Sequence, residues 1–172
     1  MIIGTLGNTE FPSTCSYVAV VGQFPGSAIN LYSTFEEAVH CLKRHEVDKV
    51  VIPAAYPKIN PIIMDEDLEA VNSFIFKIPA LVLAAKNVSD SEFECLYFHE
   101  ATLSLLNRIE DKFCFKSKQT ANSNTEAALQ AALSDKNACI TNSVCVGKFG
   151  LNILQTVKSG FKMPFIEFKD RG

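Results

Sequence analysis

The sequence has no long apolar run, and no signal-like segment opens it. Its longest apolar stretch, 75–85, is interrupted by Lys77 and Pro79, and it falls short of the about 18 residues that a transmembrane helix needs. The start of the chain lacks the basic segment followed by an apolar segment that is typical of secreted proteins. We therefore expect no membrane partner and a location in the reducing cytoplasm.

The sequence also lacks basic clusters and closely spaced cysteines. Its 16 basic and 19 acidic residues are spread along the chain and give a net charge of -3, so no basic stripe favours nucleic acid as a partner. There is no Cys-x-x-Cys pair and no Cys/His group at zinc spacing. We expect buried free thiols and no metal site. The cysteines are Cys15, Cys41, Cys95, Cys114, Cys139 and Cys145.

Apolar patterning indicates strands that alternate with helices. The 172 residues are 48% hydrophobic, with a mean hydropathy of +0.13, which is enough for a sizeable core. Alternation of this kind is typical of an α/β fold, here expected to have mostly parallel sheets. The expected strands are 2–6, 28–32, 49–52, 74–85, 95–98, 112–116, 138–141, 152–157 and 163–168, and the expected helices are 13–21, 35–45, 100–109, 125–133 and 143–149.

Helix-start signals follow several of these strands. Ser33 with Glu36 and Thr34 with Glu37 form two overlapping capping boxes, and Ser123 with Glu126 forms a third. The acidic run 65–67 is interpreted as a solvated helix start.

The long extended segment 74–85 predicts two lobes, because it can leave one sheet and enter another. We expect the first lobe to hold residues 1 to about 77 plus 151–172, and the second about 78–150. In such folds a ligand binds at the carboxyl ends of the strands, in a central cleft between the lobes. The junctions between strands and helices therefore supply the candidate site residues.

Short strings at several junctions carry a family resemblance. Gly7 and Ser13 flank the turn after the first strand, Ser33-Thr34-Phe35-Glu36 and Ser123 to Ala128 start helices, and Phe149-Gly150-Leu151 follows the last of them. With these strings in order, the chain resembles the prephenate dehydratase family. The resemblance implies a single catalytic domain over residues 1–172 with a two-lobed fold like that of type II periplasmic binding proteins. It also implies no regulatory amino-acid-binding domain.

The departures from that family fall at its functional motifs. Met163-Pro164-Phe165 stands where the family has Thr-Arg-Phe, and Ala55-Tyr56 stands where it has Glu-Asn. The chain shares these departures, together with Thr141-Asn142, with the prephenate decarboxylases of bacilysin-type pathways. In the dehydratases the Thr is assigned as the proton donor to the departing ring hydroxyl, and such acid catalysis typically contributes about 10²–10⁴ in rate. Neither Met163 nor Pro164 can donate a proton.

The resemblance thus implies a carbon-carbon lyase that needs no cofactor. It would convert prephenate to a dihydro-4-hydroxyphenylpyruvate without aromatisation, in the biosynthesis of an antibiotic or another secondary metabolite. Two alternatives stay open: a non-catalytic binding module for an aromatic-pathway metabolite, and a divergent prephenate dehydratase. The sequence leaves open whether the chain forms a homodimer.

The site residues are divided only into candidates for catalysis and candidates for substrate binding. Tyr56, His99 and Asn142 are the candidates for catalysis, and the ring proton is supplied by Tyr56, His99, water or the departing carboxylate. Ser123 is also explained as a helix cap, Tyr56 as a surface aromatic residue and His99 as a structural histidine. The expected substrate-binding residues are Ser13, Thr34, Ala55, Tyr56, Ser123, Asn124, Thr125, Thr141, Asn142, Lys162 and Met163.

Overall fold

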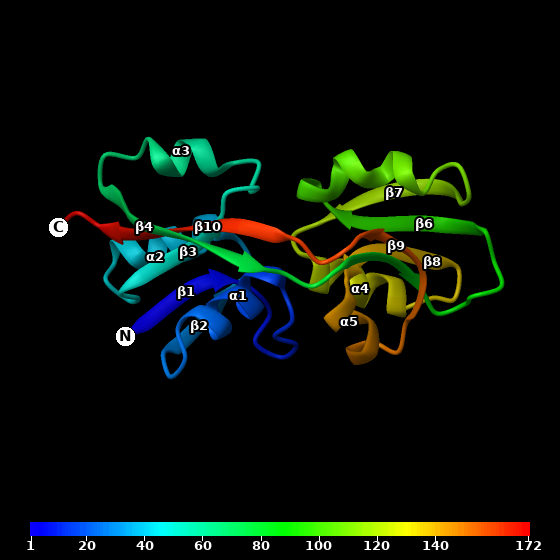
Figure 1. Ribbon diagram of the computed structural model, residues 1–172, viewed down its shortest axis with the longest axis horizontal. Coiled ribbons are helices and arrows are strands. Elements are labelled where there is room, and N and C mark those ends of the chain that lie inside the picture. Colours follow the sequence, from blue (N-terminus) through cyan, green and yellow to red (C-terminus); the bar gives the residue numbers. More distant parts are fainter. The chain divides into compact units, whose positions relative to one another are not determined.

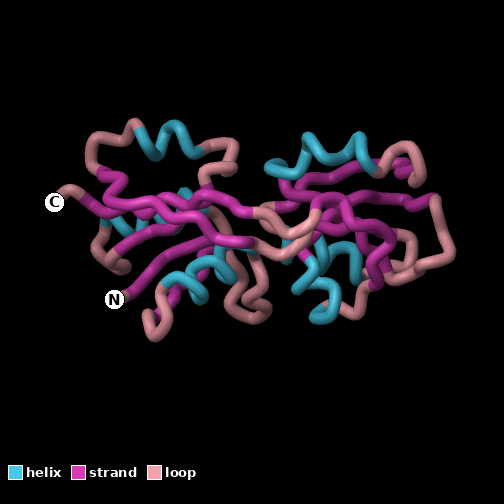
Figure 2. The backbone as a smooth tube through the Cα atoms, viewed as in Figure 1, coloured by secondary structure: helices cyan, strands magenta, loops and turns pink.

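The computed structural model describes residues 1–172, which divide into two compact units (Figure 1). The first unit comprises Met1–Ile78 and Lys162–Gly172, and the second comprises Pro79–Phe161. Each unit has a five-stranded sheet with helices on both faces (Figure 2), which confirms the predicted α/β class. None of the helices combines the length and the apolar character that crossing a membrane requires.

The first unit is built on a mixed sheet. β1, β2 and β3 run parallel, and β10 lies antiparallel between β3 and β4, so that the strand order is β2-β1-β3-β10-β4. Its strands are β1 (Ile2–Leu6), β2 (Ala28–Tyr32), β3 (Lys49–Pro53), β4 (Leu68–Lys77) and β10 (Lys162–Asp170), and its helices are α1 (Cys15–Gln23), α2 (Phe35–Lys43) and α3 (Ile59–Ile63).

One apolar cluster fixes α2 and α3 on the same face of this sheet. Phe35 and Leu42 of α2 and Ile62 of α3 pack with Ile52 and Phe168 of the sheet. The start of α2 is fixed by its cap, because Thr34 Oγ1 accepts a hydrogen bond of 3.1 Å from the Glu37 N–H. The second of the two overlapping capping boxes is therefore the one used. α1 lies on the opposite side of the sheet from α3 (Figure 1).

A buried carboxylate lies inside the first unit. Glu167 of β10 is only 1% exposed, and its two oxygens accept hydrogen bonds from Lys49 Nζ at 2.6 Å and Asn72 Nδ2 at 2.7 Å. Lys49 and Asn72 belong to β3 and β4, the strands on either side of β10. The charge is therefore paired and hydrogen-bonded, as a carboxylate removed from water must be.

The second unit repeats this arrangement with different strands. β6 pairs in parallel with β7 and β8, whereas β5 pairs antiparallel with β8 and β9, which gives the order β7-β6-β8-β5-β9. Its strands are β5 (Leu81–Ala85), β6 (Glu92–His99), β7 (Cys114–Ala121), β8 (Asn137–Asn142) and β9 (Asn152–Lys158), and its helices are the 3-10 helix η1 (Glu100–Arg108), α4 (Asn124–Ala132) and α5 (Ser143–Lys148).

Two apolar clusters cover the two faces of the second sheet. Leu106 of η1 packs with Leu83 and Leu96 on one face, whereas Ala128 of α4 and Cys145 of α5 pack with other sheet residues in the second cluster. Three alanines of α4, Ala127, Ala128 and Ala131, are buried in this cluster, so the helix lies close to the sheet.

The structure corrects three expectations. Each sheet is mixed rather than mostly parallel, because an antiparallel strand is inserted beside the parallel ones. β9, expected in the first lobe with the rest of 151–172, pairs with β5 in the second unit. Finally, the acidic run Asp65–Asp67 precedes strand β4 and starts no helix.

Candidate functional site

The parallel strands of the first unit end at one edge of its sheet. β1 leads into α1, β2 into α2, and β3 into the turn that holds Tyr56. Thr14 caps α1 and Thr34 caps α2, so backbone N–H groups of both helix starts lie at this edge. Helix N-termini of this kind attract anions. Ser13 is buried beside the first cap and donates a hydrogen bond to the Phe11 carbonyl.

The start of β10 lies at the same edge. β10 runs antiparallel to β3, so Phe165 pairs with Pro53, and the Ala54 N–H donates a hydrogen bond of 2.9 Å to the Pro164 carbonyl. Lys162 is exposed and Met163 is half-buried. The structure therefore places the Met163-Pro164 segment next to the turn that carries Ala55 and Tyr56.

Tyr56 has a defined partner within the first unit. Its phenol donates a hydrogen bond of 2.6 Å to Glu36 Oε1, in the first turn of α2. Its ring contacts Phe35, with ring centroids 4.7 Å apart. The neighbouring Ala55 is exposed. Tyr56 is thus a half-buried, fixed side chain and not a free surface aromatic residue.

The parallel strands of the second unit also end at one edge. β6 ends at His99, β7 ends just before the α4 cap Ser123, and β8 ends at Asn142. Ser123 Oγ accepts a hydrogen bond of 3.0 Å from the Glu126 N–H, which confirms the predicted capping box. The predicted residues of this unit are therefore brought together, as the positions of the strand ends had indicated.

Asn142 and Thr141 have structural roles at this edge. Asn142 Oδ1 accepts hydrogen bonds from the backbone N–H groups of Val144 and Cys145, and so caps α5. Thr141 Oγ1 donates a hydrogen bond of 2.7 Å to the carbonyl of Asn124, which ties the end of β8 to the start of α4. The Thr125 hydroxyl lies 3.8 Å from Cys145 Sγ. These contacts fix the two helix starts relative to each other.

His99 is held as a neutral side chain. Its Nδ1 accepts a hydrogen bond from the Ala101 N–H at 3.2 Å, which requires an unprotonated Nδ1. Burial lowers the pKa of His99, and the charges of Glu100 and Glu126 oppose this only in part. At neutral pH the imidazole therefore lacks the extra proton that a general acid would donate.

Sequence reasoning missed two residues at the first edge. Thr14, and not Ser13, caps α1, and it also donates a hydrogen bond of 2.6 Å to the Leu6 carbonyl. The sequence did contain a signal for this cap, because Thr14 carries a hydroxyl two residues after Pro12. Glu36 was interpreted only as part of a capping box, and no local pattern could connect it with Tyr56, 20 positions further along the chain.

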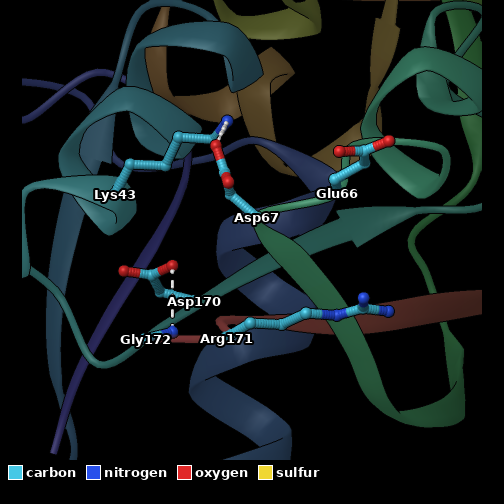
Figure 3. A pocket seen from close by; sticks show the side chains of 6 residues that line it. All are labelled: Lys43, Glu66, Asp67, Asp170, Arg171 and Gly172. Atoms are coloured by element: carbon cyan, nitrogen blue, oxygen red, sulfur yellow. Dashed lines mark hydrogen bonds and ion pairs between the residues drawn. The ribbon is translucent and has the colours of Figure 1, made fainter.

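A surface pocket lies at the opposite edge of the first sheet and contains none of the predicted site residues. Its volume is ≈ 440 Å³, and its lining comes from the end of α2, the turn before β4, and the end of β10 with the two residues after it. Lys43 forms ion pairs with Asp65 and Asp67. Figure 3 shows the Arg171 side chain directed away from Lys43 and Asp67. No group of three or more His, Cys, Asp or Glu side chains is arranged to hold a metal ion.

Solved structures share the fold. Prephenate dehydratase from Arthrobacter aurescens, in complex with L-Phe, superposes on 100% of this chain with a TM-score of 0.72 and 16% identity. Prephenate dehydratase from Staphylococcus aureus subsp. aureus Mu50 does so with a TM-score of 0.70 and 17% identity. The chain spans 61% and 67% of those two chains. These similarities confirm the predicted two-unit α/β fold of the periplasmic-binding-protein type.

A curated protein is also similar in sequence. A prephenate decarboxylase from Planktothrix agardhii (strain NIVA-CYA 126/8) is 26% identical over 151 residues, which are 83% of this chain and 75% of that protein. No protein-family model matches the chain.

Proposed function

We propose that this chain is a cofactor-free lyase that removes carbon dioxide from prephenate without forming an aromatic ring. The observation that carries the proposal is the lack of a proton donor in the segment Met163-Pro164, beside the Tyr56 turn. The sequence similarity to a prephenate decarboxylase and the fold shared with prephenate dehydratases support prephenate as the substrate. A role in secondary metabolism and a cytoplasmic location remain predictions.

The reaction is balanced without loss of water. The bond between the ring and its carboxylate breaks, and its electron pair forms a new ring double bond. The adjacent double bond shifts, and a ring carbon takes up one proton from solvent water. The ring hydroxyl leaves only if it receives a proton, because hydroxide is a poor leaving group. A site without such an acid therefore favours a product that keeps its hydroxyl.

The other side chains considered as acids support the same product. The Tyr56 proton is hydrogen-bonded to Glu36, and the lowered pKa of His99 keeps its imidazole neutral. We propose that the backbone N–H groups at the starts of α1, α2 and α4 bind the carboxylate and keto groups. Hydroxyl and amide groups of Ser13, Thr34, Asn124 and Asn142 would supply further hydrogen bonds.

Product identification tests the proposal. Purified protein incubated with prephenate should release carbon dioxide and yield a dihydro-4-hydroxyphenylpyruvate, identified by NMR. Phenylpyruvate as the main product would identify a divergent dehydratase instead. Saturable binding with unchanged prephenate would identify a non-catalytic binding module. Either result would overturn the proposal.

A pair of variants isolates the missing hydroxyl. Met163→Thr introduces a hydroxyl where the dehydratases have one. Met163→Val introduces a side chain of nearly the same shape as Thr but without the hydroxyl. We expect Met163→Thr to produce more phenylpyruvate than Met163→Val. Equal amounts from both variants would show that the hydroxyl at this position does not control the fate of the ring alcohol.

A further inference from the structure

The hydrogen bond between Tyr56 and Glu36 fixes the direction in which the phenol can act. The two oxygens are 2.6 Å apart, and both side chains are half-buried. The Tyr56 ring rests on Phe35, and its backbone is held in a turn in which the Tyr56 N–H donates to the Pro53 carbonyl at 2.9 Å. Ring and backbone are therefore both positioned before any ligand binds.

The direction of this hydrogen bond follows from the groups involved. An ionised carboxylate can only accept, whereas a phenol has one proton to donate and lone pairs that accept. The first turn of α2, where Glu36 lies, favours a negative charge. Because the single phenol proton is directed to Glu36, the Tyr56 oxygen offers a ligand only its lone pairs.

We propose that Glu36 is a positioning residue that makes Tyr56 a hydrogen-bond acceptor for the ring hydroxyl of the substrate. The inference rests on the proposed function, and it explains how the hydroxyl is retained. A hydroxyl that donates to Tyr56 is held without receiving a proton, so water does not leave. Tyr56 then selects ligands that carry a hydroxyl on the ring, and it gives no proton to the reaction.

Removal of the carboxylate tests the role of Glu36. In Glu36→Met the Tyr56 proton is released and can be donated to the ring hydroxyl, so the ratio of phenylpyruvate to the hydroxylated product should rise at least tenfold. The matched control is Glu37→Met, one residue away, whose carboxylate accepts hydrogen bonds from the Ser33 N–H and hydroxyl. Glu37→Met should leave the product ratio unchanged.

Binding of product-like acids tests Tyr56 without any turnover. The wild-type protein should bind 4-hydroxyphenylpyruvate about fivefold more tightly than phenylpyruvate, because one hydrogen bond contributes about 1 kcal/mol and a factor of ten would need about 1.4 kcal/mol. In Tyr56→Phe, which keeps the ring on Phe35, the two dissociation constants should become equal. This variant also provides a test if Glu36→Met does not fold.

The outcomes separate the two proposals. If the wild-type protein leaves prephenate unchanged, the proposed function fails, and the preference for 4-hydroxyphenylpyruvate still tests the acceptor role of Tyr56. If the protein decarboxylates prephenate but Glu36→Met gives the wild-type product ratio, the role of Glu36 is overturned. A preference for the hydroxylated acid that persists in Tyr56→Phe overturns the role of Tyr56.

Discussion

The buried ion pair between Lys49 and Glu167 allows a quantitative prediction about the first unit. Lys49→Met keeps most of the apolar stem of the side chain and removes its ammonium group, which leaves the Glu167 carboxylate 1% exposed with Asn72 as its remaining side-chain partner. Removing one partner of a buried pair typically costs about 3–5 kcal/mol. The Lys49 side chain is itself 19% exposed, so solvent can partly replace it. We therefore expect a loss of about 3 kcal/mol in the free energy of unfolding.

The double variant Lys49→Met with Glu167→Met makes the test sharper. With both the ammonium and the carboxylate removed, no buried charge is left without its partner. Replacing a buried ion pair with apolar side chains is often neutral or stabilising. The double variant should thus be more stable than Lys49→Met alone. Urea denaturation followed by far-UV circular dichroism measures both, since the chain has no Trp. Lys169→Met, at an exposed position of β10, is the control and should change stability by less than about 0.5 kcal/mol.

Two results would refute this reasoning. A loss below about 1 kcal/mol in Lys49→Met would mean that water reaches Glu167 and solvates it. A double variant that is no more stable than the single variant would mean that the cost arises from packing and not from an uncompensated charge.

Three further predictions concern the second unit. Asn142→Ala removes the α5 cap and should lower stability by about 1–2 kcal/mol, and its turnover of prephenate should fall further than that loss explains. As the pH falls below about 6.5, the lowered pKa of His99 should cost the wild-type protein at most about 1.4 kcal/mol of stability per pH unit. His99→Asn keeps an acceptor for the Ala101 N–H and should abolish this loss. Maleimide should label Cys114, the exposed thiol, fastest in the native protein.

Each of these predictions has a result that contradicts it. Equal losses of stability and activity in Asn142→Ala would leave that residue with a structural role only. If the stability of His99→Asn falls with pH as steeply as that of the wild-type protein, another group causes the effect. A lowered pKa destabilises the folded state only where the unfolded chain binds the extra proton and the folded chain does not. Fast labelling that persists in Cys114→Ser would show that another thiol is accessible.

The sequence predicted which residues lie at the strand ends better than it predicted the pairing of the strands. Thr34, Ser123 and Asn142 were selected because polar residues after successive parallel strands meet at one edge of a sheet, and each lies at the carboxyl end of a parallel strand in the sheet of its own unit. The second of two capping boxes at α2 could not be selected in advance, since Ser33 and Thr34 both have a glutamate three residues later.

Long-range pairing had no local signal. Both β9 and β10 were expected in the first lobe, yet β9 pairs with β5 in the second unit and β10 pairs with β3 and β4 in the first. Alternating side chains show that a segment is a strand but not which neighbour it joins. The contact between Tyr56 and Glu36 was missed for the same reason, because it depends on how the turn after β3 packs against α2.

The position of β10 has a consequence for the order in which the chain folds during synthesis. The second unit is one continuous segment, Pro79–Phe161, and its five strands are all available once that segment has left the ribosome. The first unit must wait until β10 has been translated, because β10 occupies the place between β3 and β4. We therefore expect nascent chains to carry a folded second unit while the N-terminal strands still lack their central partner.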